Sequence, residues 1–229
     1  FLARCEVGAN GNSSERFDVG PYCNDFIHVV QTNAQSLACH SELFAGDKMG
    51  EAVVRLFELY AQSLPPGPER EAAERLHTIW VLANGPLKPA EKLTRFYTPN
   101  MVLIDHRTPG VGRLDGAEKI AESVRVFVDE LTEGYVSRVL EIHRRSPRGT
   151  LELQRSNGID RNSGGPWERE ILDIYLFDAD GFITHHERFE PHHLKQALAR
   201  YDELTGAGPT AEPSGVEPLC RTPPANTAT

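Results

Sequence analysis

The order of patterns along the chain restricts its fold most, because helical segments come first and four strand segments come last. Residues 136–144, 150–160, 168–177 and 182–189 have the length and the apolar or alternating pattern of strands. Residues 178–181, Asp-Ala-Asp-Gly, form a hairpin turn between the last two strands. A run of helices followed by a run of strands is typical of the α+β class, so we expect an α+β domain.

The helical part also has a readable pattern. Residues 51–64 and 69–83 carry apolar side chains at helical spacing, and a proline-rich turn separates them. We expect a short helix near residues 89–97 and a short strand at residues 101–106. A third long helix follows Asp115, whose side chain is suited to cap its first turn.

Composition predicts two segments outside the patterned domain. The domain covers residues 47–204, whereas residues 1–46 are weakly patterned. Pro, Gly, Ala and Thr dominate residues 205–229. A segment of this composition cannot bury enough apolar surface to order itself, so we predict a disordered tail.

Two short stretches echo each other and suggest an internal repeat. Residues 52–59 resemble residues 197–204, and residues 15–18 resemble residues 187–190. The sharper hypothesis is that residues 1–18 are the last hairpin of a preceding copy of the domain, in a longer tandem protein. Chance is the alternative, because Arg, Glu and Leu are common on helices.

Charge and hydropathy exclude two classes of partner. The chain has 229 residues and a formal net charge of −9. Phosphate contacts need clustered Lys and Arg, so we predict no nucleic-acid partner. No apolar run approaches the ~18 residues of a membrane span, so we predict no membrane partner.

Cysteine and histidine spacing gives no metal motif. Cys5, Cys23, Cys39 and Cys220 form no C-x-x-C pair, and we interpret them as reduced thiols of a cytoplasmic protein. One disulfide in the N-terminal segment is the alternative. The adjacent histidines, His185-His186 and His192-His193, lack a zinc-binding frame. We therefore predict neither a metal nor a cofactor.

Polar residues on apolar strand faces are the candidate site. A polar group on a buried face costs several kcal/mol unless it is paired, so its presence needs a reason. The candidates share faces with apolar neighbours, and Asp105 lies where its strand ends. If these faces line one cavity, the polar candidates in it are Asp105, Arg155, Asn157, Asp173, His185 and Glu187, beside Tyr175 and Phe189.

Each candidate also has a purely structural interpretation. Arg155 and Glu187 could form an ion pair across the sheet. Asn157 could be a hydrogen-bonded strand end, and Asp173 could face a dimer partner. Asp105 could cap the turn that follows it.

At this point the motifs resemble a known family. Residues 96–105 with 116–120, and residues 172–189, are similar to the nuclear-transport-factor-2-like (NTF2-like, also SnoaL-like) superfamily. The resemblance covers about residues 50–204. It implies a curved antiparallel sheet wrapped by helices, a cone-shaped or cystatin-like roll, around an apolar pocket. This superfamily includes isomerases, cyclases, hydrolases and binding domains, so the resemblance leaves the activity open.

A narrower resemblance concerns the larger protein. Residues 64–70, 105–107, 187–189 and 197–204 are similar to SnoaL-like units at the C-terminal end of large actinobacterial regulatory proteins. This agrees with the hypothesis that the chain is part of a longer protein.

Two enzymes of the superfamily imply roles for residues of this chain. The resemblance to ketosteroid isomerase gives Asp105 as the base, Asp173 as a protonated hydrogen-bond donor and Tyr60 as its partner. The resemblance to limonene-1,2-epoxide hydrolase places its Asp-Arg-Asp set on Glu187, Arg155 and Asn157. Asn157 replaces a carboxylate there, which counts against epoxide hydrolysis. The two resemblances disagree on which face of the last strand lines the pocket. The position of Glu187 among apolar residues of its strand face favours the face that carries Glu187.

Three functions therefore remain. The first is a ligand-binding or regulatory module that holds a small apolar molecule with a polar handle, oriented by Arg155 and Glu187 and contacted by His106. The second is an acid–base enzyme that works beside a carbonyl group, with Asp105 and Asp173 as its carboxyl groups. The third is a domain that forms homodimers through the sheet, for which residues 168–177 are apolar on both faces.

Overall fold

The computed structural model describes residues 1–9, 12–13, 18–33 and 35–206. These residues fall into two units, and the boundary along the chain lies between Lys48 and Met49. Most of the predicted tail, and residues 15–17 of the echoed motif, lie outside the described residues. Both the disordered tail and the tandem repeat stay predictions.

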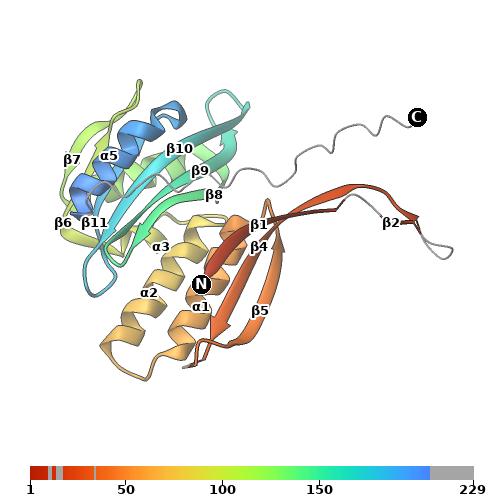
Figure 1. Cartoon of the computed structure of the whole chain (residues 1–229). Coiled ribbons are helices and arrows are strands. Elements are labelled where there is room, and N and C mark those ends of the chain that lie inside the picture. The colour runs from red at the N-terminus through yellow and green to blue at the C-terminus, as the bar shows by residue number, and fades with distance from the viewer. Residues whose placement is uncertain (10–11, 14–17, 34, 207–229) are drawn as a thin grey trace. The chain divides into compact units, whose positions relative to one another are not determined.

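The first unit is a small antiparallel sheet in the order β1-β4-β5 (Figure 1). Its strands are β1 (Leu2–Ala9), β4 (Tyr22–Thr32) and β5 (Ala38–Ala45), with the short pair β2 (Asn12–Ser13) and β3 (Asp18–Val19). The sequence pattern predicts none of these strands, because only the middle one is buried, at Ile27, Val29 and Val30. β1 pairs with β4, with Leu2 opposite Val29. Its partner strand therefore lies outside residues 1–18, the range of the hairpin in the tandem hypothesis.

The second unit begins with the predicted helices. These are α1 (Met49–Ser63), α2 (Pro68–Ala83), α3 (Glu91–Thr94) and α4 (Ala117–Arg125), which continues as the π-helical turn η1 (Val126–Leu131). Gly116 is the N-cap residue of α4, and its φ of 92° lies in the region that favours glycine. The expectation that Asp115 caps this helix is wrong, because Asp115 ends strand β7 and pairs with Arg113 at 2.7 Å.

Six strands form the main sheet, in the order β7-β6-β11-β10-β9-β8. They are β6 (Tyr97–Asp105), β7 (Gly112–Asp115), β8 (Thr132–Ser146), β9 (Gly149–Asp160), β10 (Pro166–Phe177) and β11 (Ile183–Phe189). The α+β class is confirmed. The sheet is mixed rather than wholly antiparallel, because β11 pairs with β6 in parallel. A parallel pair needs a long connection, and the chain between these two strands supplies it.

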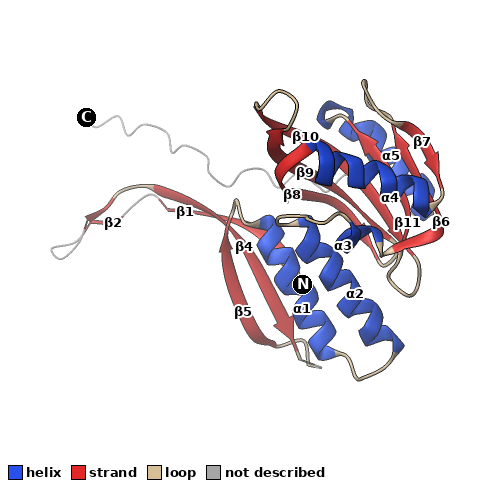
Figure 2. Cartoon of the chain, turned by 180° about the vertical axis from the view of Figure 1, so that it is seen from behind, coloured by secondary structure: helices blue, strands red, loops and turns tan. Residues whose placement is uncertain are grey.

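Elements cover the sheet on both faces (Figure 2). After a 3-10 turn (Pro191–His193), helix α5 (Leu194–Thr205) packs on one face. Its Ala197 and Tyr201 join a buried cluster with Leu172 and Ile174. Helices α2, α3 and α4 lie toward the other face, so β10 is buried on both faces, as its apolar sequence predicts.

Candidate functional site

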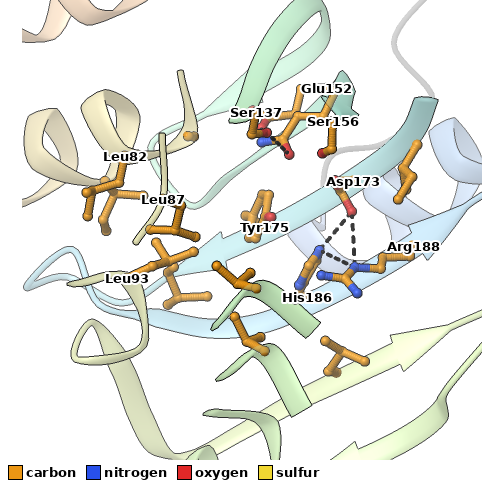
Figure 3. A pocket seen from close by; sticks show the side chains of 18 of the residues that line it. Leu82, Leu87, Leu93, Ser137, Glu152, Ser156, Asp173, Tyr175, His186 and Arg188 are labelled. Atoms are coloured by element: carbon orange, nitrogen blue, oxygen red, sulfur yellow. Dashed lines mark hydrogen bonds and ion pairs between the residues drawn. The ribbon is translucent and has the colours of Figure 1, made fainter. Parts of the chain in front are cut away.

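A cavity of about 150 Å³ lies between the helices α2 to α4 and the inner face of the sheet (Figure 3). Its helix side is apolar, with Leu82, Leu87 and Leu93 grouped together. Its sheet side is polar, with Asp173, His186 and Arg188 on the opposite side of the view. The cavity therefore offers hydrogen-bonding groups against an apolar wall.

Strand β9 contributes its polar face to this cavity. The lining residues on β9 are Thr150, Glu152, Gln154 and Ser156, and all four are buried. The alternate residues, Leu151 and Leu153, pack with helix α5 on the outer face. The expectation that the apolar face of β9 lines the cavity is therefore wrong, because that face is covered by a helix instead.

Strands β10 and β11 bring together a buried carboxylate, an imidazole and a guanidinium. Nε2 of His186 lies 2.8 Å from Oδ1 of Asp173, and Nε of Arg188 lies 3.6 Å from the same oxygen. The ring of Tyr175 stacks on His186, with 4.1 Å between centroids. All four side chains line the cavity.

The contact with Asp173 favours one tautomer of His186. With the Asp173 carboxylate as acceptor, Nε2 of His186 carries the proton and donates it. Nε of Arg188 also lies 3.4 Å from Nε2, and in this tautomer its acceptor is Asp173 instead. Burial lowers the pKa of His186, which keeps the ring neutral, and nearby Arg188 acts in the same direction. Nδ1 of His186 is then an acceptor, and it is buried without a hydrogen-bond partner.

Glu152 is the second carboxyl group of the cavity wall. It lies opposite Asp173 in the strand register, and 1% of its surface is exposed. Burial, and then the charge of Asp173, raises the pKa of Glu152 to about 8. Glu152 is therefore protonated at neutral pH, although it also accepts a hydrogen bond of 2.8 Å from Gln154.

Of the residues expected at the site, the structure brings Asp173 and Tyr175 together at the cavity. Glu187 lies on the outer face of β11, where it is fully buried. It contacts His106 and His185 at 2.7 Å each, and Arg200 at 2.8 Å. Burial alone would raise the pKa of Glu187, but these partners lower it to about 2. The geometry makes it an anchor between β11 and α5 rather than a ligand contact.

Asp105 also lies outside the cavity lining. Its carboxylate receives two hydrogen bonds of 2.8 Å from the Arg107 guanidinium, and it accepts the backbone N–H groups of Arg107 and Val111. Against the effect of burial, these bonds lower the pKa of Asp105 to about 2. This matches the turn-capping alternative and opposes a role as the base.

The remaining candidates lie elsewhere in the unit. Arg155 pairs with Glu170 at 2.6 Å and not with Glu187, so the ion pair expected across the sheet does not form. Asn157 is exposed at the end of β9, and Tyr60 is 44% exposed on α1.

His106 and Phe189 form a stacked pair on the outer side, with 4.3 Å between ring centroids. Phe189 belongs to the cluster under α5, so neither ring lines the cavity.

The sequence reasoning missed most of the polar lining. His186 and Arg188 flank Glu187, which was chosen, and Glu152 lies on the same strand as the chosen Arg155 but on its opposite face. The alternation of Thr150, Glu152, Gln154 and Ser156 was the signal that could have found Glu152, because four polar residues in step predict one common environment.

The sheet, its covering helices and the cavity between them give the α+β arrangement that the sequence pattern predicts. No protein-family model matches the sequence, and a search of curated proteins finds no match. Solved structures do match. A Catenulispora acidiphila protein with a ketosteroid isomerase-like fold, in complex with trimethylamine, is 16% identical with a TM-score of 0.42, over 55% of this chain and 91% of that chain.

Two further structures are NTF2-like proteins. One, of unknown function, is from Exiguobacterium and is 12% identical with a TM-score of 0.39, over 51% of this chain and 95% of that chain. The other is from Burkholderia thailandensis and is 18% identical with a TM-score of 0.43, over 58% of this chain and 98% of that chain.

Two searches of the described residues found nothing. No group of three or more His, Cys, Asp or Glu side chains there is placed to hold a metal ion. Among the same residues, none of the helices has the length and apolar content to cross a membrane.

The anchor at Glu187 predicts a large loss of stability on substitution. Glu187→Gln removes the buried carboxylate that pairs with Arg200. We therefore expect a loss of about 3–5 kcal/mol in the free energy of unfolding. Urea denaturation measures this. The control is Glu203→Gln, which removes the exposed partner of the same arginine and should cost less than about 1 kcal/mol. Equal effects of the two variants would contradict the anchor.

Protonated Glu152 predicts that stability falls as pH rises. Its pKa is about 8 in the folded chain against an ordinary value of 4.5, so between these values the folded state binds more protons than the unfolded state. The free energy of unfolding therefore decreases across this window. Denaturant midpoints measured between the two pH values should decrease more in the wild type than in Glu152→Gln. Exposed Glu168→Gln is the control and should follow the wild type. Parallel curves for all three proteins would exclude a protonated Glu152.

Proposed function

We propose that residues 49–206 bind a small, largely apolar molecule with a polar handle, as a regulatory ligand-binding module of a larger cytoplasmic protein. The observation that carries this proposal is the cavity, apolar on its helix side and hydrogen-bonding on its sheet side. Ligand pockets have this composition, with a few placed polar groups among apolar side chains. Nδ1 of His186, buried without a partner, supports it further, because buried polar atoms are normally satisfied.

The size of the cavity limits the ligand. One water needs about 10–15 Å³ of this kind of volume, so 150 Å³ corresponds to a ligand of about ten non-hydrogen atoms. Monoterpenoids and single-ring aromatic compounds are of this size. A steroid is larger and would need the walls to move, so the resemblance to ketosteroid isomerase does not extend to its substrate.

Acid–base catalysis is the second candidate, and the pair of Asp173 and His186 favours it. An imidazole held by a carboxylate at one nitrogen, with the other nitrogen unpartnered, is the arrangement of a general base. Asp105, held by Arg107, would not take part. Turnover of a bound carbonyl compound would favour this candidate, and saturable binding without turnover favours the module.

A homodimer through the sheet is the third candidate. Helix α5 already covers the outer face around Leu151, Leu172 and Ile174. A second copy would have to use the part of that face that α5 leaves open, so this proposal has less support than the first.

A thermal-shift screen tests the binding proposal. Small apolar carbonyl, terpenoid and aromatic compounds should raise the unfolding temperature of the full chain in a concentration-dependent way, because a ligand of the folded state stabilises it by mass action. Val124→Phe adds volume to the cavity wall and should reduce the shift. Val81→Phe, on the exposed side of α2, should leave it unchanged. No shift with any compound, or equal shifts in both variants, would contradict binding in this cavity.

A further inference from the structure

Three arginines meet at one end of the cavity. Arg169 lies in the first half of β10, and Arg188 near the end of β11, which runs antiparallel to β10. Arg107 follows the end of β6, which runs parallel to β11. The strand directions therefore bring all three to the same edge of the sheet, and all three line the cavity.

Two of these arginines have a carboxylate partner. Arg107 makes two hydrogen bonds of 2.8 Å to Asp105, and 12% of its side chain is exposed. Nε of Arg188 lies 3.6 Å from Asp173, and 22% of its side chain is exposed. Each of these two charges thus has a carboxyl group beside it.

Arg169 has no carboxylate partner among the described residues. Its guanidinium carbon lies 4.3 Å from the centre of the Phe127 ring and 5.2 Å from that of Trp167. Its Nε is buried and makes no hydrogen bond. Burial lowers the pKa of Arg169, and the like charges of Arg188 and Arg107 add to that effect.

The balance of charge around this end is positive. Three arginines stand beside two carboxyl groups, Asp105 and Asp173, so Arg169 is the one without a carboxyl partner. Glu152 does not compensate it at neutral pH, because its carboxyl group is protonated. A partly buried charge without a counter-charge is costly, and an anion beside Arg169 would reduce that cost.

The opposite end of the cavity is apolar. It is formed by the start of β6, the end of β10 and the start of β11, and by helices α2 and α3. The lining residues there are Ile79, Leu93, Tyr97, Phe177 and Ile183. A ligand that fills the cavity therefore meets a cationic wall at one end and a hydrocarbon wall at the other.

We propose that the ligand is a small apolar monocarboxylate, whose carboxylate binds Arg169 with help from Arg188 and whose hydrocarbon body fills the end near Phe177. The inference rests on the proposed function and adds its ligand class. A single excess positive charge matches one carboxylate, whereas a phosphate ester would bring more negative charge than the wall can balance. The cavity also leaves little room for a phosphate beside an apolar body.

The test compares two ligands of one skeleton, para-isopropylbenzoate and para-isopropylbenzamide, by calorimetric titration of the full chain at neutral pH. A charge-assisted pair is stronger than a neutral hydrogen bond, so the carboxylate should bind about tenfold to a hundredfold more tightly than the amide. This comparison uses the wild-type protein alone and does not depend on any variant folding.

Arg169→Met then tests the residue. Methionine keeps an apolar stem against Phe127 and Trp167 while it removes the charge. The variant should lose the preference for the carboxylate and keep its affinity for the amide. The matched control is Arg155→Met, an arginine on neighbouring β9 that pairs with Glu170 outside the cavity, and it should keep the preference.

The outcomes separate this inference from the proposed function. Equal affinities for para-isopropylbenzoate and para-isopropylbenzamide, or binding of neutral compounds only, would overturn the carboxylate inference. The binding proposal would remain. A preference that survives in Arg169→Met would overturn the role of Arg169. No binding by any compound of the thermal-shift screen would overturn both.

Discussion

The buried contact between Glu187 and Arg200 determines which side chains reach the cavity. Residues alternate between the two faces of a strand, so fixing one residue fixes its neighbours. With Glu187 held on the outer face by α5, His186 and Arg188 must point inward. The Asp173 contact of His186 and the whole polar wall follow from that choice of face.

The class of the fold and most of its elements could be predicted from the sequence. The spacing of apolar residues and the turn residues between segments predict the helices of residues 49–83 and the last four strands. Each of these patterns is long enough to be recognised from neighbouring residues alone. β7 has four residues and escapes that reading. The parallel pairing of β11 with β6 joins segments far apart in the chain, which no local pattern records.

The site could be predicted only in part, for one physical reason. An apolar strand face shows that something covers it, but does not show whether the cover is a helix or a ligand. Here helix α5 covers Leu151 and Leu172, so Glu187 and Phe189 are buried beside it. Asp173 and Tyr175 were found because β10 is apolar on both faces, and either choice of face would have included buried positions.

The cavity combines groups that shift one another's protonation. Asp173 favours a proton on Nε2 of His186, and its charge raises the pKa of Glu152 on the neighbouring strand. The wall is thus held with a neutral carboxyl, a neutral imidazole and one excess guanidinium. In the proposed function, such a wall would distinguish ligands by charge at one end, and the leucine side would contact their hydrocarbon part.

Xenon titration followed by methyl NMR tests the cavity itself most directly. Xenon enters apolar cavities without needing hydrogen bonds, so it reports the hollow rather than a specific ligand. Saturable shifts should appear at the methyl groups of Leu93, Leu103 and Ile183, which line the apolar end, and not at exposed Val81. Shifts that stay linear with xenon pressure at all four residues would mean that this space is filled and that no internal site exists there.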